Sequence, residues 1–266
     1  MGNELERPDV AGATGAAGAT DAAGILARAR RAGPIGGLPD ACRPHDAAEA
    51  YAIQDALIAL VGPVGGWKVG AAAPDAEPTC APIAAATLLA SPATWPAHGD
   101  RRGVEAEIAF RLARDLPASG APWNRDGVIA AIADAGPAIE ICESRFVDFE
   151  AVDPWTRLAD GNLNAALVLG PAWAGWRDLD PASQPVRLLV GGDPVVSQKG
   201  GNTAGDLIRL VVWLANHVAA RGHPLRAGQV VTTGSWTGLR FVPAASAVEA
   251  DFPGIGTARL AAAGRV

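Results

Sequence analysis

The chain has 266 residues, of which 49% are hydrophobic and 19% charged, which is enough for a sizeable hydrophobic core. Its 22 basic and 28 acidic residues give a formal net charge of −6, which argues against a nucleic-acid partner. No window approaches the roughly 18 consecutive apolar residues of a membrane-spanning helix, so we expect no membrane association. The first residues lack the basic and apolar regions of a secretory signal, and three scattered cysteines predict reduced thiols, so we expect a cytoplasmic protein.

The first part of the chain predicts a tail followed by two helices. Residues 1–20 are rich in Ala, Gly and Thr without a usable period, which predicts a flexible tail. A short helix is expected over residues 21–31. Asp46 and Glu49 form a capping-box pair before a second helix, which Gly62 and Pro63 end.

The middle of the chain predicts strands with one helix between them. We expect a short strand over residues 65–70, then a Pro- and Ala-rich loop with short strands over residues 71–99. Apolar side chains alternate with Glu105 and Glu107 in the next strand, a helix is expected over residues 126–135, and Glu140 lies in a third strand. Residues 149–159 read as a loop.

The last part predicts two strands, a long helix and a final strand. Strands are expected over residues 165–170 and 186–190, and Gly191-Gly192-Asp193-Pro194 is typical of a turn. Residues 206–221 have apolar side chains at helical spacing, and residues 229–233 then predict a strand. Strands with irregularly inserted helices favour an α+β fold over a regular series of βαβ units.

The glutamates are the first candidate for chemistry. Residues two apart on a strand share one face, so Glu105 and Glu107 should project side by side. Adjacent carboxylates repel unless they face water or share a proton or a cation. With Glu140 they would offer three oxygen ligands suited to Mg²⁺ or Mn²⁺, although such glutamates can also mark the wet face of a sheet.

Other polar residues leave two interpretations open. Lys68 could extend its amine to water, or it could stabilise an enolate beside a metal. Thr233, Gly234 and Ser235 could hold a substrate carboxylate or form an ordinary turn. Asp160 could shape a turn or anchor the pocket, and Arg145 could form an ion pair or contact substrate.

Four segments in order make the chain recognisable. They are Gly-Trp-Lys-Val-Gly, Val-Glu-Ala-Glu-Ile-Ala-Phe, Ala-Ile-Glu-Ile-Cys-Glu-Ser-Arg-Phe, and the stretch from Trp-Leu-Ala-Asn-His to Thr-Thr-Gly-Ser-Trp-Thr-Gly. Together they resemble the 2-keto-4-pentenoate hydratase family, a branch of the fumarylacetoacetate hydrolase superfamily that also includes 4-oxalocrotonate decarboxylases. The resemblance covers most of residues 21–266.

This resemblance implies a fold and a set of roles. The fold would be a fumarylacetoacetase-like mixed β-sheet roll with peripheral helices, forming a single catalytic domain over residues 21–266 and assembling as a homo-oligomer. By similarity, the metal ligands would be Glu105, Glu107 and Glu140, the catalytic residues Lys68 and Asp160, and the substrate-binding residues Thr233, Gly234, Ser235 and Arg145. The family's Asp-Asn-Ala-Ser-Ser is replaced here by Asp160-Gly161-Asn162-Leu163-Asn164, so its serines are lost.

The activity implied is a Mg²⁺- or Mn²⁺-dependent hydratase acting on a small 2-oxo acid or 2-hydroxydienoate, as in aromatic-compound degradation. Three alternatives stay open. A decarboxylase of a 2-oxo-dienedioate would need Arg145 or Arg240 for a second carboxylate. An acylpyruvate C–C hydrolase would need a water-activating pair such as His45 and Glu49. A non-catalytic 2-oxo-acid binder would have lost its proton-transfer groups.

Overall fold

The computed structural model describes residues 15–96 and 101–262. The chain divides into two compact units, one made of residues up to Val61 with Ser144–Asn162, the other of Gly62–Glu143 with Leu163–Val266. All strands of the described residues belong to the second unit. The prediction of a single domain over residues 21–266 stays a prediction.

The first unit is helical. Its helices are α1 (Gly15–Ala32), α2 (Ala47–Val61) and α4 (Pro154–Ala159). Helix α1 begins inside the predicted tail, because alanine is the strongest helix former, and residues 1–14 of that tail lie outside the described residues. The capping box of α2 is confirmed, since Asp46 Oδ1 accepts from the Glu49 N–H at 2.8 Å and Glu49 Oε2 accepts from the His45 N–H at 2.8 Å. Asp46 therefore caps α2, while the Glu49 carboxylate binds the backbone N–H of His45.

Helix α4 corrects the prediction of a loop over residues 149–159. The side chain of Asp153 accepts from the N–H groups of Trp155 and Thr156, both at 2.9 Å, and Pro154 occupies the first turn. Asp-Pro is therefore a helix start here. A helix of six residues is too short to show the apolar periodicity on which the prediction depended.

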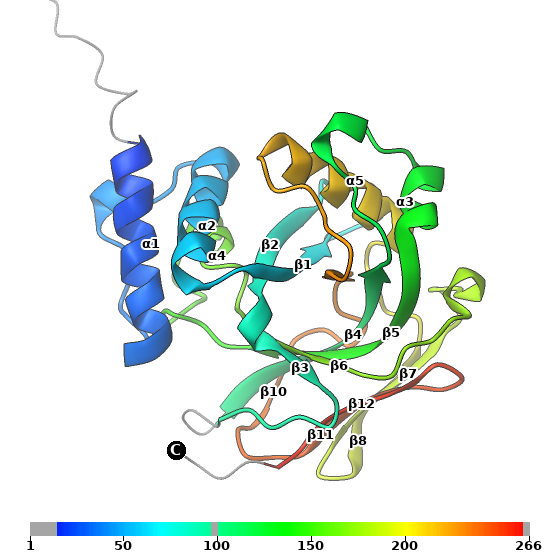
Figure 1. Cartoon of the computed structure of the whole chain (residues 1–266). Helices are drawn as coiled ribbons and strands as arrows, with labels where there is room; N and C mark the ends of the chain where they lie inside the picture. The colour runs from blue at the N-terminus through cyan, green and yellow to red at the C-terminus, as the bar shows by residue number, and fades with distance from the viewer. Residues whose placement is uncertain (1–14, 97–100, 263–266) are drawn as a thin grey trace, which may run out of the picture. The chain divides into compact units, whose positions relative to one another are not determined.

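The second unit contains two sheets (Figure 1). The larger has eight strands in the order β2-β1-β9-β4-β5-β6-β3, with β10 paired to β4, and the smaller has the order β12-β11-β7-β8. The larger sheet comprises β1 (Val64–Gly70), β2 (Thr79–Ala84), β3 (Leu88–Ala90), β4 (Arg101–Leu112), β5 (Ile132–Cys142), β6 (Asn164–Leu169), β9 (Val230–Thr232) and β10 (Arg240–Pro243). The smaller comprises β7 (Pro185–Val190), β8 (Asp193–Lys199), β11 (Val248–Phe252) and β12 (Gly256–Leu260).

Two helices of the second unit, α3 (Arg125–Ala131) and α5 (Leu207–Ala220), pack beside each other, and α5 also packs against β1. In Figure 1 they lie along the outside of the curled larger sheet. The predicted α+β fold, a mixed sheet roll with peripheral helices, is confirmed. None of the helices in the described residues is long and apolar enough to cross a membrane.

Several boundaries differ from the prediction. Helix α3 ends at Ala131 and β5 begins at Ile132, so the residues predicted as the end of a helix extend the strand instead. Asp193 and Pro194 begin β8 after a turn at Gly191 and Gly192, which both have positive φ. Ladder pairing with β4 and β7 decides these positions, and local sequence does not contain that information.

The register of the larger sheet brings the candidate residues onto its inner face. Strands β4 and β5 are antiparallel and pair Glu105 with Glu140, while β1 and β9 are parallel and pair Lys68 with Thr232. Directly paired residues point to the same side of a sheet. All four side chains therefore belong to the same face of the larger sheet as Ala109, which lies two residues after Glu107 and pairs with Thr232.

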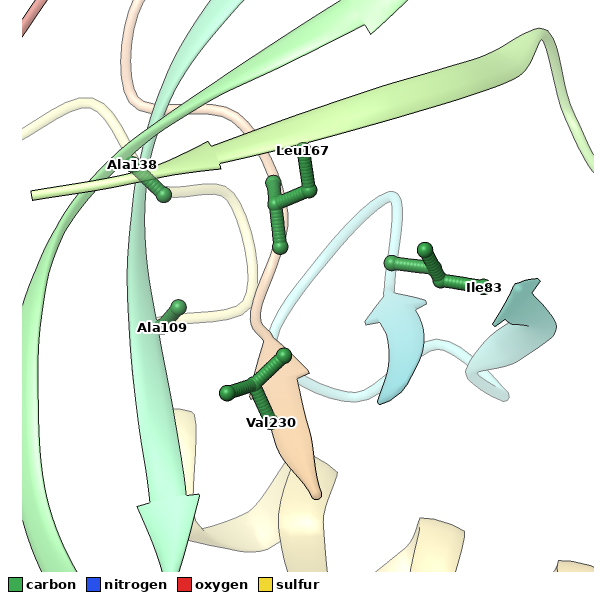
Figure 2. Packing of buried hydrophobic residues seen from close by; sticks show 5 residues of the cluster. All are labelled: Ile83, Ala109, Ala138, Leu167 and Val230. Carbon is green, nitrogen blue, oxygen red and sulfur yellow. The ribbon is translucent and has the colours of Figure 1, made fainter. Parts of the chain in front are cut away.

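The same inner face carries a small apolar cluster. Its side chains come from β2, β4, β5, β6 and β9. They are shown in Figure 2 and are Ile83, Ala109, Ala138, Leu167 and Val230. Ala138 precedes Glu140 by two residues on β5, so it continues the face on which the carboxylates lie. The roll therefore has a dry, close-packed section beside its carboxylates, and this section fixes the strands that hold them.

Candidate metal centre

Two of the three carboxylates predicted to bind metal, those of Glu105 and Glu140, meet inside the second unit, and Glu107 interacts electrostatically with both. Glu107 and Glu140 are 1% and 0% exposed, and Glu105 is partly buried. One carboxylate oxygen each from Glu105 and Glu140 and the thiol of Cys142 all lie within 4.8 Å of one another. Glu107 Oε2 accepts hydrogen bonds from the Thr232 hydroxyl and from the Gly234 N–H, the latter at 3.0 Å.

Burial and mutual repulsion raise the pKa values of two carboxyl groups in this cluster, those of Glu105 and Glu107. Burial, and next the neighbouring Glu140 carboxylate, raise the pKa of Glu105 above its ordinary value. Burial together with the Glu140 and Glu105 carboxylates raises the pKa of Glu107 well above it. A divalent cation would remove this repulsion, so the electrostatics of the cluster fit a metal site.

The two oxygens of Glu140 have different surroundings. Oε1 accepts from Lys68 Nζ at 2.6 Å and from Asn164 Nδ2 at 2.9 Å. Oε2 is buried and accepts no hydrogen bond from the described residues. Buried acceptors nearly always have a partner, so an anionic oxygen left without one fits coordination to a cation.

Lys68 extends from β1 into the same cluster. Its side chain is 15% exposed and contacts Glu140. Burial alone would lower the pKa of Lys68, but the carboxylates, Glu140 foremost among them, raise it above its ordinary value. Lys68 therefore carries a stable positive charge next to the candidate metal ligands.

The turn after β9 contacts the carboxylates through its backbone and its serine. Gly234 has a φ of 86°, which lets its N–H reach Glu107, and Ser235 forms a side-chain hydrogen bond with Glu105. Thr233 is turned the other way, because its hydroxyl donates to the Ile108 carbonyl at 2.8 Å. The structure thus brings this predicted segment to the glutamates.

Sequence reasoning missed three partners of the cluster. Thr232 bonds Glu107, Asn164 bonds Glu140, and Asn202 Nδ2 donates to the carbonyls of Thr233 and Gly234 at 2.9 and 3.0 Å. Asn164 follows two residues with positive φ, Asn162 at 50° and Leu163 at 69°, and strained backbone of this kind is concentrated at functional sites. The loss of the family's serines at this position was the signal that could have drawn attention to Asn164.

Asp160 and Arg145 belong to the helical unit, where they bind each other. Arg145 Nε lies 2.6 Å from Asp160 Oδ1, Arg145 Nη2 donates to the Asp160 carbonyl at 2.8 Å, and both residues are buried. The ion-pair interpretation of Arg145 is therefore confirmed, with Asp160 as its partner. The catalytic role of Asp160 and the substrate contact of Arg145 stay predictions, and Arg240 is exposed on β10.

The fold and this cluster define a class of protein. The fumarylacetoacetate (FAA) hydrolase C-terminal family matches residues 58–261, a span that includes all three glutamates and Lys68. The chain belongs to this family.

Two relatives of known name, both hydratases, are similar to the chain in sequence. The chain is 32% identical over 237 residues to the 2-keto-4-pentenoate hydratase of Burkholderia vietnamiensis, covering 85% of this chain and 89% of that one. It is 34% identical over 155 residues to the 2-hydroxyhexa-2,4-dienoate hydratase of Comamonas testosteroni, covering 58% of this chain and 57% of that one.

The fold is also that of a solved decarboxylase. The 4-oxalocrotonate decarboxylase from Pseudomonas putida G7, complexed with magnesium and adipate, superposes with a TM-score of 0.78. The match covers 91% of this chain and 96% of that chain at 22% identity, so it supports the fold alone.

Proposed function

We propose that this protein is a divalent-metal-dependent hydratase, a hydro-lyase that adds water to a 2-hydroxy-2,4-dienoate to give a 4-hydroxy-2-oxo acid. The observation that carries this proposal is the buried carboxylate cluster on the β4–β5 pair, in a chain that is 32% and 34% identical to two relatives named as hydratases. The decarboxylase likeness is weaker support, because it rests on 22% identity.

Glu105, Glu107 and Glu140 would hold Mg²⁺ or Mn²⁺. A bound cation of this kind would act as a Lewis acid and stabilise negative charge at the 2-oxygen of the substrate. The protein's own groups orient Glu107 and Glu140, since Thr232 and Gly234 bond the first and Lys68 and Asn164 bond the second. Ligands fixed in this way lose little conformational freedom on binding.

The protein's own groups would bind and polarise the substrate. Lys68 keeps its proton and would donate a hydrogen bond to the oxygen on which enolate charge develops. The turn of Thr233, Gly234 and Ser235 would bind the substrate carboxylate. Of its two hydroxyl groups, that of Ser235 forms a hydrogen bond with Glu105. The small residues Ala109 and Ala138 leave the neighbouring interior apolar, which would exclude water from the enolate.

Product analysis tests this proposal. Incubation with 2-hydroxypenta-2,4-dienoate and Mg²⁺ should abolish the absorbance of the dienoate and yield 4-hydroxy-2-oxopentanoate by NMR. The Glu105→Gln variant should not form the product. Release of carbon dioxide from a 2-oxo-dienedioate, without hydration of the monoacid, would instead identify a decarboxylase. Homo-oligomeric assembly and a cytoplasmic location remain predictions.

A further inference from the structure

The thiol of Cys142 faces the metal ligands, although the hydratase chemistry does not use it. Cys142 ends β5, two residues after Glu140, and is 4% exposed. Its Sγ donates a hydrogen bond to Glu105 Oε2 at 3.7 Å, and the sulfur lies within 4.8 Å of one carboxylate oxygen each from Glu105 and Glu140.

The separation between the Cys142 sulfur and the Glu105 oxygen matches that of two ligands on a shared thiophilic ion. Zinc bonds thiolate sulfur at about 2.3 Å and carboxylate oxygen at about 2.1 Å, so two such ligands at a tetrahedral angle lie about 3.6 Å apart. The sulfur and oxygen of Cys142 and Glu105 are already 3.7 Å apart. Little movement would be needed to bring both onto one ion.

The buried carboxylate of Glu140 also indicates a cation at this place. Glu140 is fully buried, its Oε1 is taken by Lys68 and Asn164, and its Oε2 has no hydrogen-bond partner among the described residues. This leaves Oε2 for a ligand, and a carboxylate oxygen of Glu140 lies within 4.8 Å of the Cys142 sulfur. Glu105, Glu140 and Cys142 therefore form a mixed oxygen and sulfur donor set.

We propose that Glu105, Glu140 and Cys142 bind thiophilic divalent cations such as Zn²⁺ or Cd²⁺, in competition with the Mg²⁺ of the hydratase. The proposal rests on the proposed function, because both cations would use Glu105 and Glu140. On binding, the thiol proton passes to solvent and the sulfur becomes an anionic ligand. Sulfur ligands select soft metals, whereas Mg²⁺ prefers oxygen, so Cys142 should leave Mg²⁺ binding unaffected and make the enzyme sensitive to inhibition by Zn²⁺.

Cadmium tests the sulfur ligand directly. Metal-free protein is titrated with Cd²⁺ while the ultraviolet charge-transfer band of a cadmium–thiolate bond is recorded. The expected result is a saturable band that persists in the Cys42→Ser control, disappears in Cys142→Val, and is suppressed by excess Mg²⁺. Cadmium NMR of the unmodified protein gives the same information without a substitution, through a resonance shifted by a sulfur ligand.

A parallel titration with Mn²⁺, followed by electron paramagnetic resonance, separates this inference from the proposed function. Retained Mn²⁺ binding in Cys142→Val, together with loss of the cadmium band, supports both. Mn²⁺ binding with no cadmium band that depends on Cys142, or with a cadmium NMR shift of oxygen ligands only, overturns the inference and leaves the hydratase proposal standing. Absence of Mn²⁺ binding beside a Cys142-dependent cadmium band would remove the proposed function and the competition with Mg²⁺.

Discussion

Two buried groups of charged side chains, one in each unit, differ in how their charge is balanced. In the helical unit the Asp160 carboxylate is surrounded by Arg145 at 2.6 Å and Arg30 at 3.9 Å. In the strand unit, three glutamates lie near one lysine. Lys68 forms an ion pair with Glu140 and interacts electrostatically with Glu105 and Glu107.

The difference separates a structural ion pair from a candidate functional site. A buried pair with direct hydrogen bonds satisfies both partners and needs nothing further. Buried carboxylates in excess repel one another, and this costs stability in the absence of a ligand. Carboxylates with strongly raised pKa values and one neighbouring cation mark a candidate site for a bound metal or for proton transfer.

The largest effect should follow from Glu107→Gln. This substitution removes an anionic ligand, and it also relieves the burial of a charge and the carboxylate repulsion that together raise the pKa of Glu107. We expect Mg²⁺ binding by calorimetry to be lost, while thermal unfolding of the metal-free protein stays at the same temperature or rises. Unchanged Mg²⁺ affinity, or a variant that does not fold, would contradict the assignment of Glu107 to a metal site.

Asp160→Asn should show the opposite pattern. It leaves Arg145 and Arg30 without their carboxylate in a buried position, which should cost about 3–5 kcal/mol of unfolding free energy. Urea denaturation measures this loss. Asp115→Asn is the matched control, since it breaks an exposed ion pair with Arg226 and should change stability far less. Equal losses of unfolding free energy in the two variants would contradict the assignment of Asp160, Arg145 and Arg30 as a stabilising ion-pair network.

Asn164→Ala tests whether the hydrogen bond to Glu140 positions a metal ligand. Removal of the amide that orients Glu140 should weaken Mg²⁺ binding about 10–100-fold, as is typical for groups that position a ligand. Asn164→Ser, which restores a hydroxyl at this position, should recover part of the affinity. If the two variants bind Mg²⁺ as tightly as the unmodified protein, Asn164 has only a packing role.

The smallest effect expected is a dependence of stability on pH. Because the pKa values of Glu105 and Glu107 are raised in the folded protein, the folded state binds more protons than the unfolded state. Stability of the metal-free protein should therefore fall as pH rises above about 4.3, the ordinary glutamate pKa. Mg²⁺ should raise the melting temperature more at higher pH. A stabilisation by Mg²⁺ that is independent of pH would argue against carboxylate ligands.

Much of the fold and most of the cluster could be predicted from sequence, because the signals were local. The alternation around Glu105 and Glu107, the capping box at Asp46 and the apolar period of α5 all lie within short windows. Recognition of the motif order then supplied the family.

The missed features depend on pairing between distant segments. Asn164 and Glu140 meet because β5 and β6 are neighbours with a register shift at Cys142, and no local pattern reveals that register. The contact of Asp160 with Arg30 was missed because the two residues lie 130 positions apart in the chain. Strands β10 and β11 are only four and five residues long and give too little alternation to count.

Hydrogen exchange at C3 of a simple 2-oxo acid tests the central claim most directly. NMR of 2-oxopentanoate in D₂O would follow exchange with and without Mg²⁺, with Glu107→Gln alongside. We expect exchange that requires both the metal and the intact glutamate, which would show that the carboxylate cluster promotes enolisation. Exchange that is absent with every divalent cation tested, or that is equally fast in Glu107→Gln, would contradict the account.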